Sequence, residues 1–239
     1  MEVKHRGFTL IELLILIAIV SVLVMLVLAG AFPAMKNAAE NAKCVNNLRQ
    51  IGIGLSSFAN DHDNKIMPRL YMTSSDATTA TYWRRVLTKG GYMGSDGRGK
   101  NQDPPVFYCP SWPPTGPTDT RVDPPIHGMY GYGLRNWGDY PNSNNLLSLT
   151  KIVKPADFFI VVDSYFSKEK VQGYMVTQGS ESWRIHLRHG GRANALFADW
   201  HVEAKDREYF ERLHMDTNQI TGATTDGRPF YLWPEKGGN

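Results

Sequence analysis

Glu12 is the only ionisable residue inside an otherwise apolar segment that runs from Phe8 to Phe32. On membrane-insertion scales an ionisable group in such a segment costs up to about 3 kcal/mol, so a function and a cationic partner are expected for it. If the chain is cut after Gly7, the new α-ammonium of Phe8 on a neighbouring subunit can be this partner. The alternative is that Glu12 lies one turn into the membrane and directs its carboxylate to the lipid headgroups.

Cys44 and Cys109 are the two cysteines of the chain. If the domain that carries them lies outside the inner membrane, its compartment is oxidising and favours a disulfide. A bridge that closes a loop of about 66 residues stabilises by roughly 4 kcal/mol in the chain-entropy model. We therefore predict a disulfide between Cys44 and Cys109. The alternative is two unrelated buried thiols.

His189, Asp199 and His201 form a third group that could do chemistry. Asp199 and His201 are two residues apart on an expected strand and would share a face, as a metal or acid–base site requires. However, the sequence contains no G-x-S-x-G elbow, no H-E-x-x-H and no P-loop. We therefore expect Asp199 to cap a turn and His189 to hydrogen-bond across a hairpin. Neither enzymatic activity nor a cofactor is predicted.

An acidic run, Asp61-His62-Asp63-Asn64, has the composition of a calcium loop. No glutamate follows at EF-hand spacing, and helix-stop and turn chemistry explain the same residues. No metal site is predicted.

The apolar segment that carries Glu12 is long enough to cross a membrane. Its 25 residues form a helix of about 37 Å, against a bilayer core of about 30 Å. The segment is longer than the apolar region of a cleaved signal peptide, roughly 7–15 residues, and no small-x-small cleavage site follows it. The basic leader (Lys4, His5, Arg6) and the lack of a strong basic cluster after Phe32 place the N-terminus in the cytoplasm.

A second helical half follows Pro33. Apolar residues recur at spacings of three, four or seven from Ala34 to about Ala59, on one stripe. We expect one helix from Phe8 to about Ala59, kinked or locally unwound near Gly30–Pro33. The stripe of its outer half must be covered, so a sheet should pack on it.

Strand signals concentrate in the last third of the chain. The run Phe158–Asp163 is apolar and β-prone enough for a central strand, Arg184–Arg188 alternates, and Asn194–Asp199 and Trp200–Ala204 suit two strands around a turn. Short helices are expected at Tyr82–Gly90 and Asp206–Met215. The predicted fold class is α+β: a long N-terminal helix packed on an antiparallel β-sheet with long loops.

The charge of the chain excludes one class of partner. The net charge is +3, and no basic stripe alternates with aromatic residues. No nucleic acid is expected.

The segment Lys4-His5-Arg6-Gly7-Phe8-Thr9-Leu10-Ile11-Glu12-Leu13-Leu14 resembles the class III leader and cleavage site of type IV pilins and type II secretion pseudopilins. In that family a prepilin peptidase cuts after the glycine and N-methylates the new first residue. The glutamate in the fifth position of the mature chain then pairs with the N-terminus of a neighbour. The resemblance implies cleavage between Gly7 and Phe8, N-methylation of Phe8, and an assembly role for Glu12.

A second resemblance covers the C-terminal part. His189 and Asp199 are spaced as in the H-x9-D-G motif of prepilin-like proteins that some environmental bacterial lineages encode in large numbers. The segments Cys44–Gly52 and Phe107–Ser111 agree with that group. This sequence departs from the motif at Trp200, where the motif has glycine. Glycine suits a turn residue with positive φ and tryptophan is poor there, so the departure concerns the geometry of the turn.

The leading interpretation is a pilin-like structural subunit with three parts: a leader (1–7), a transmembrane and filament-core helix (8–32), and an extracytoplasmic pilin-like domain (33–239). It would be anchored in the inner membrane by a single pass, with its domain in the periplasm, and would then enter an extracellular filament. The expected partners are prepilin peptidase, an assembly platform and other pilin or pseudopilin subunits.

The alternative interpretation is a membrane-anchored module that binds a polymer or glycan. In it, the loop Gly94–Pro125 and the aromatic residues Trp112 and Trp137 would contact the ligand. The sequence leaves open whether a filament would be a pilus or a secretion pseudopilus. The large domain favours a minor or specialised pseudopilin.

Overall fold

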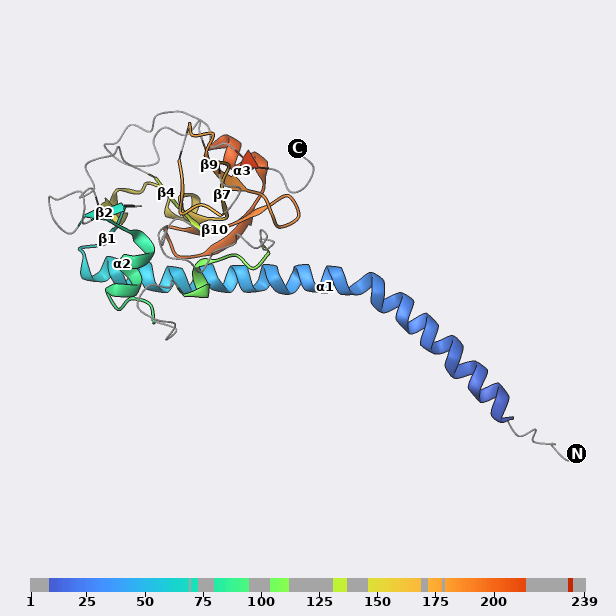
Figure 1. The fold of residues 1–239 in the computed structure, drawn as a ribbon. Helices are drawn as coiled ribbons and strands as arrows, with labels where there is room; N and C mark the ends of the chain where they lie inside the picture. Colours follow the sequence, from blue (N-terminus) through green and yellow to red (C-terminus); the bar gives the residue numbers. More distant parts are fainter. Residues whose placement is uncertain are drawn as a thin grey trace, which may run out of the picture. The chain divides into compact units, whose positions relative to one another are not determined.

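Helix α1 (Leu10–Asp61) is the longest element of the computed structural model shown in Figure 1. Its 52 residues correspond to a length of about 78 Å. The helix continues through Gly30 and Pro33, so of the two alternatives predicted there, a kink or local unwinding, the unwinding is not observed. A proline inside a helix removes one backbone hydrogen bond, and the remaining bonds keep this segment helical.

The structure describes residues 9–68, 70–72, 80–94, 104–111, 131–136, 146–168, 172–177, 179–213 and 232–233. The chain divides into two compact units, Met1–Ala39 and Glu40–Asn239. Helix α1 contributes its first part to one unit and its second part to the other.

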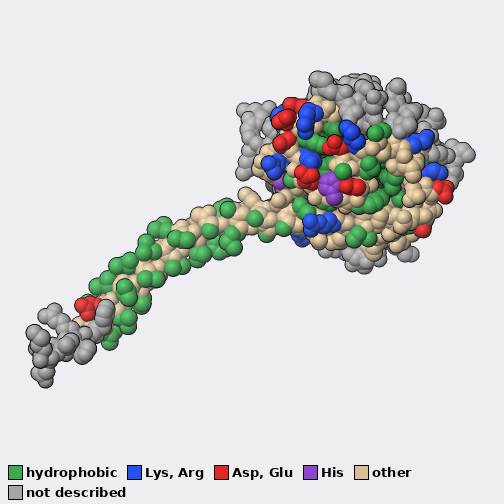
Figure 2. Space-filling model, turned by 180° about the vertical axis from the view of Figure 1, so that it is seen from behind, with side chains coloured by type: hydrophobic (Ala, Val, Ile, Leu, Met, Phe, Trp, Pro, Cys, Tyr) green, Lys and Arg blue, Asp and Glu red, His purple; other side chains and the backbone are tan. Residues whose placement is uncertain are grey.

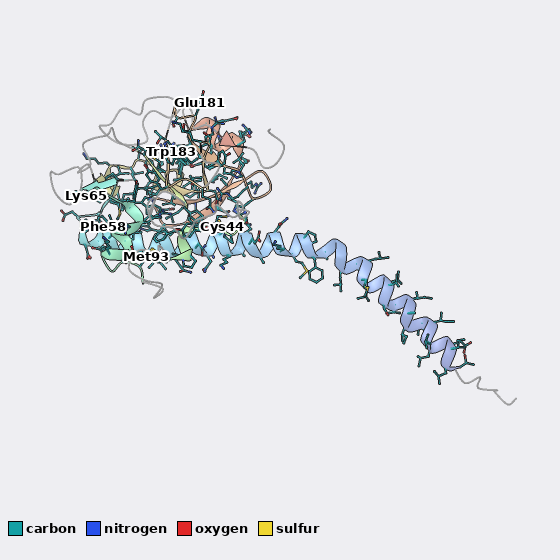
Figure 3. All side chains as sticks on the ribbon, in the orientation of Figure 1. Cys44, Phe58, Lys65, Met93, Glu181 and Trp183 are labelled. Atoms are coloured by element: carbon teal, nitrogen blue, oxygen red, sulfur yellow. The ribbon has the colours of Figure 1, made fainter. Side chains whose placement is uncertain are left out.

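The second part of α1 forms one wall of the core. Its buried residues follow a spacing of three and four: Cys44, Leu48, Ile51, Leu55 and Phe58. Figure 3 labels Cys44 and Phe58 on the side of the helix that carries the strands. The prediction of a single apolar stripe covered by a sheet is therefore confirmed.

A five-stranded sheet covers this stripe. Its strand order is β11 (Val202–Lys205), β10 (Ala193–Phe197), β6 (Phe159–Val162), β4 (Gly133–Arg135) and β8 (Met175–Val176). The predicted central strand is β6, and all four of its residues are buried. One face of the sheet packs on α1, and the other packs on the helix α3 (Arg207–Arg212).

Gly52 allows α1 to approach this sheet closely. A Cβ atom at Gly52 would lie 2.9 Å from Cδ1 of Leu196 on β10, closer than real contacts allow. This glycine therefore serves close packing.

A three-stranded sheet has the order β12 (Leu232–Trp233), β9 (Trp183–His186) and β7 (Ser164–Phe166). The remaining elements of the described residues are short. Strand β1 (Lys65–Ile66) pairs with β5 (Leu147–Ser148), and β2 (Leu70–Met72) pairs with β3 (Ala80–Tyr82). The others are the helix α2 (Trp83–Lys89) and 3-10 turns at Pro105–Phe107, Leu149–Lys151 and Pro155–Asp157. Both predicted short helices are thus present as α2 and α3.

The predicted α+β fold with a long N-terminal helix is confirmed, with two differences in the sheets. The pairs β4–β8 and β9–β12 are parallel, so the sheets are mixed rather than purely antiparallel. Strands β9 and β10, which flank Gly190-Gly191, also do not pair as an antiparallel hairpin, because β9 pairs with β7 and β12. The two glycines have φ of 63° and 79° and turn the chain from one sheet to the other.

The turn between β10 and β11 forces Trp200 into the left-handed region, with φ of 73°. The Trp200 amide donates to the Phe197 carbonyl (3.0 Å), and the Phe197 amide donates to the His201 carbonyl (2.9 Å). These bonds fix the turn whatever residue occupies position 200. The geometry that favours glycine is therefore kept although tryptophan is present.

Comparing Trp200→Gly with Trp200→Ala isolates the backbone cost at this position, because both changes remove the indole. We expect the glycine variant to be more stable by about 1 kcal/mol, since a Cβ is disfavoured at positive φ. Urea unfolding of both purified proteins in the same detergent gives the difference. Equal stability, or a more stable alanine variant, would contradict a left-handed Trp200.

Candidate functional site

The first part of α1 presents apolar side chains that the rest of the described chain does not cover. The most apolar 18-residue window of the helix has none of its residues buried, and the helix is long and apolar enough to cross a membrane. Figure 2 shows hydrophobic side chains along this part. Such a surface needs a lipid or protein environment.

Glu12 forms a capping box at the start of α1. Its Oε2 accepts from the backbone N–H and the hydroxyl of Thr9, both at 2.8 Å, and its own N–H donates to Thr9 Oγ1 at 3.3 Å. This reciprocal arrangement satisfies donors that a helix N-terminus leaves unpaired. Both contacts use one carboxylate oxygen, and Oε1 has no partner among the described residues.

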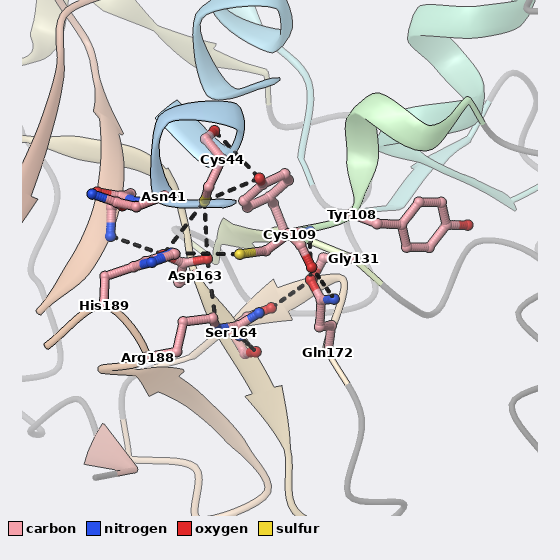
Figure 4. A network of polar contacts seen from close by, with 12 residues as sticks. Asn41, Cys44, Tyr108, Cys109, Gly131, Asp163, Ser164, Gln172, Arg188 and His189 are labelled. Atoms are coloured by element: carbon pink, nitrogen blue, oxygen red, sulfur yellow. Dashed lines mark hydrogen bonds and ion pairs between the residues drawn. The ribbon is translucent and has the colours of Figure 1, made fainter. Parts of the chain in front are cut away.

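A second group of reactive side chains lies in the core of the unit Glu40–Asn239. It comprises Cys44, Cys109, Asp163 and His189, and one possible ligand atom from each lies within 4.8 Å of the others. Helix α1 supplies Cys44, and the segment after the 3-10 turn at Pro105–Phe107 supplies Cys109. Asp163 joins β6 to β7, and His189 lies in the turn after β9. Figure 4 shows the four side chains converging. We call this group the buried cluster.

Direct contacts join the members of the buried cluster. The Cys44 thiol donates to Asp163 Oδ1 at 3.6 Å, and Cys109 Sγ lies 3.4 Å from His189 Nε2. The same His189 Nε2 lies 3.2 Å from Asp163 Oδ2. The Asp163 side chain is 0 % exposed and that of His189 is 4 % exposed. The contacts are therefore shielded from water.

Neighbouring polar groups hold the cluster in place. Gln172 accepts from the Cys109 amide (3.0 Å) and donates to the Cys109 carbonyl (3.1 Å). Asn47 of α1 donates to the Tyr108 carbonyl at 3.0 Å, and the Tyr132 hydroxyl donates to Cys44 Sγ at 3.1 Å. The segment that carries Cys109 is thus fixed both to α1 and to the segment before β8.

Asp163 has further partners. The Asn194 amide donates to its Oδ2 at 2.9 Å, and the buried Arg188 guanidinium lies with Nε 3.7 Å from Oδ1. Burial alone would raise the pKa of Asp163, but Arg188, His189 and the Asn194 amide together lower it. Asp163 is therefore an anion in the core.

Burial and the same contacts also shift the pKa values of the other three members of the cluster. Burial would lower the pKa of His189, but its hydrogen bonds with Asp163 and Cys109 raise it to about 10. Burial would raise the pKa of Cys109, but hydrogen bonds from Cys44 and His189 lower it to about 6. Burial, the bond to Cys109 and the charge of Asp163 raise the pKa of Cys44. These contacts thus favour the thiolate form at Cys109 and the thiol form at Cys44.

The structure changes the sequence-based view of the cysteines. The predicted Cys44–Cys109 disulfide is not present, and both cysteines are unbridged. The alternative of unrelated thiols is also wrong, since both sulfur atoms belong to the buried cluster. Helix α1 and the loop after residue 104 bring them together across 65 positions of sequence.

The motif residues separate into two places. His189 contacts Asp163 rather than lying with Asp199. Asp199 accepts from the His201 amide at 3.2 Å and also contacts His201 Nδ1, so it caps its turn as predicted. Sequence reasoning missed Asp163, which directly follows β6, and Arg188, which is two residues beyond the end of β9. A charge at the end of an apolar run was the signal available for Asp163.

Several predicted residues lie outside the described part of the chain. These are Gly7 and Phe8, at which processing is expected, and Trp112 and Trp137, which the binding interpretation uses. In the acidic run 61–64, Asp63 and Asn64 have φ of 54° and 56° and end α1. This agrees with the turn chemistry inferred for the run.

Comparison with family models gives one match, to the prokaryotic N-terminal methylation motif, over residues 3–28. Comparisons with curated proteins and with solved structures give no match. The matched motif and the apolar helix support a type IV pilin-like or pseudopilin precursor that is anchored in a membrane. The motif also implies processing by prepilin peptidase and assembly with other pilins.

Asp163→Asn removes the anion of the buried cluster and leaves the Arg188 and His189 cations without it. Breaking a buried pair in this way costs about 3–5 kcal/mol, so we expect a loss of this size in the free energy of unfolding. Urea unfolding monitored by tryptophan fluorescence measures it.

Asp199→Asn is the matched control for this change. Asp199 also contacts a histidine, but its side chain is 38 % exposed. Its loss should cost no more than about 1 kcal/mol. Similar costs for the two variants would show that Asp163 is not the anion on which the cluster depends.

Proposed function

We propose that this chain is a structural subunit of a type IV pilus-like filament or a type II secretion pseudopilus. Prepilin peptidase cuts it between Gly7 and Phe8, and it assembles through the first part of α1. The observation that carries this proposal is the apolar helix with a single acid, Glu12, near its inner end, within the matched methylation motif.

The apolar side chains of the helix must be covered both in the membrane and in the filament. Its apolar side chains from Leu10 to Leu28 are exposed in the isolated chain. In the membrane lipid covers them, and in a filament the helices of sister subunits replace the lipid. Helix packing within an apolar environment allows this exchange without a large loss of apolar burial. The chain is therefore suited to move from membrane to filament.

Glu12 supplies the specificity that the apolar surface lacks. Oε2 is held by Thr9, and Oε1 remains available to a donor on a neighbour, such as the methylated α-ammonium of Phe8. A charge pair in an environment without water is strong and fixes the axial position of one helix against the next. Cleavage after Gly7 retains Thr9, so the capping box survives processing.

The domain 33–239 lies in the periplasm before assembly, by this proposal, and forms the outer surface afterwards. Its size favours a minor or specialised pseudopilin over a major pilin. No catalytic role is assigned to it. The second candidate, a membrane-anchored module that binds a polymer or glycan, would require that a ligand bind independently of assembly.

Glu12→Ala should abolish filament assembly while the protein is still inserted in the membrane and processed. Thr9→Val is the informative control, because it also breaks side-chain contacts of the capping box but keeps the carboxylate. If Glu12 acts only as a helix cap, the two variants will assemble equally poorly. If Glu12 pairs with a neighbour, Thr9→Val will retain most filaments.

Ser21→Ala controls for the loss of any polar group from the helix, since the Ser21 hydroxyl donates to its own Ile17 carbonyl. Electron microscopy and the quantity of subunit in the sheared fraction measure assembly. Normal filaments from Glu12→Ala would refute the assembly role of the acid.

Mass spectrometry of the N-terminus tests processing separately. We expect the protein isolated from its own cells to begin at N-methylated Phe8, and a Gly7→Val variant to keep Met1. The retained leader would then prevent assembly. A native protein that begins at Met1, or that lacks the whole apolar segment, would contradict the proposal.

A further inference from the structure

The buried cluster has the composition and spacing of a metal site. We propose that Cys44, Cys109, Asp163 and His189 together bind one zinc ion in the core of the unit Glu40–Asn239. This assignment is independent of filament assembly.

The donor types suit zinc. Zn²⁺ binds cysteine sulfur, histidine nitrogen and carboxylate oxygen, and four protein ligands in a tetrahedron are typical of its structural sites. Magnesium and calcium prefer all-oxygen sites, so the two sulfurs argue against them. The four donors here are two sulfurs, one nitrogen and one carboxylate.

The spacing suits a tetrahedron. Zinc–ligand bonds of about 2.0–2.3 Å place tetrahedral ligand atoms about 3.3–3.8 Å apart. The observed separations are 3.4 Å for Cys109 Sγ and His189 Nε2, 3.2 Å for His189 Nε2 and Asp163 Oδ2, and 3.9 Å for Cys44 Sγ and the same Asp163 oxygen. All four donor atoms lie within 4.8 Å of one another, so an ion at the centre requires the longest separation to shorten by about 1 Å at most.

The orientation of His189 favours a metal over a catalytic triad. One nitrogen, Nε2, contacts both Cys109 and Asp163. In a Cys–His–Asp triad the thiol and the carboxylate use opposite ring nitrogens. A single N–H cannot be aligned with both partners at once, whereas an ion between the three atoms satisfies all of them. Burial of the cluster also leaves no place for a substrate.

The metal-bound site is electrically neutral only if the charge of a neighbouring arginine is counted with it. Zn²⁺ with two thiolates, one carboxylate and a neutral imidazole carries one net negative charge. Arg188, whose side chain is 2 % exposed and lies 3.7 Å from Asp163 Oδ1, supplies one positive charge. The metal-bound core is then neutral, as burial requires.

The ligands also have the supporting contacts that metal sites need. The Asn194 amide fixes Asp163, the Tyr132 hydroxyl fixes Cys44, and Gln172 fixes the backbone of Cys109. Outer contacts of this kind orient the ligands of zinc sites. Since the four ligands come from α1, a loop, a strand junction and a turn, the ion would join α1 to the sheet. The site is closed and therefore structural.

Metal analysis of the full-length protein, purified in detergent from its own membranes without chelator, tests the proposal. We expect one zinc ion per chain. Cys109→Ser and His189→Gln should each lose at least about tenfold in zinc affinity. His201→Gln removes a histidine from the surface turn and serves as the matched control, with unchanged zinc content.

Two measurements on the wild-type protein remain decisive if the variants fail to fold. Replacing zinc by Co²⁺ should give the visible bands of tetrahedral cobalt and a thiolate-to-cobalt charge-transfer band. Removing the metal with a chelator should lower the Tm by roughly 5–10 °C, and added Zn²⁺ should restore it.

Three results would overturn the proposal. The first is a native protein without metal in which mass spectrometry of the unreduced chain finds a Cys44–Cys109 disulfide. The second is a metal-free protein that has two free thiols without added reducing agent and takes up neither Zn²⁺ nor Co²⁺. The third is zinc that is retained in Cys109→Ser and His189→Gln, which would place the metal elsewhere.

Discussion

The carboxylate of Asp163 is the constraint on which the folded unit depends. A charge with 0 % exposure is tolerated only if partners replace the water it has lost. Arg188 and His189 do so from the turn after β9, the Asn194 amide does so from β10, and Cys44 donates to the carboxylate from α1. Elements distant in sequence must therefore meet at one point. The apolar core around them gives stability, whereas this polar centre specifies the relative placement of helix and sheet.

Helix α1 meets two environments along one continuous backbone. From Leu10 to Leu28 its apolar residues are exposed all round, but from Cys44 to Phe58 they follow a single stripe. The second part is a wall of the core, with Gly52 against Leu196 on β10. A fragment cut after Phe58 would lose that wall. Anchor and domain can therefore be separated only upstream of Cys44, and the boundary of the two compact units at Ala39 agrees with this.

Sequence patterns with a local cause were predictable. The spacing of apolar residues in α1 and the apolar run of β6 depend on neighbours in the chain. The same holds for the turn before β11 and for the positive φ at position 200. Partners across the fold were not predictable. His189 was singled out, but it was expected to hydrogen-bond across a hairpin. Its partner, Asp163, lies 26 residues earlier in the sequence, at the junction of β6 and β7.

Glu12 and Asp163 show how environment assigns different roles to two carboxylates. Both oxygens of Asp163 are occupied by partners within the chain, so this carboxylate is held by the fold itself. Glu12 is held through Oε2 alone, by a residue three positions away, and Oε1 has no partner among the described residues. Because its local contact leaves one oxygen available, Glu12 can gain a partner without losing its helix cap. Full satisfaction suits an acid that fixes a fold, and partial satisfaction suits the assembly role that we propose for Glu12.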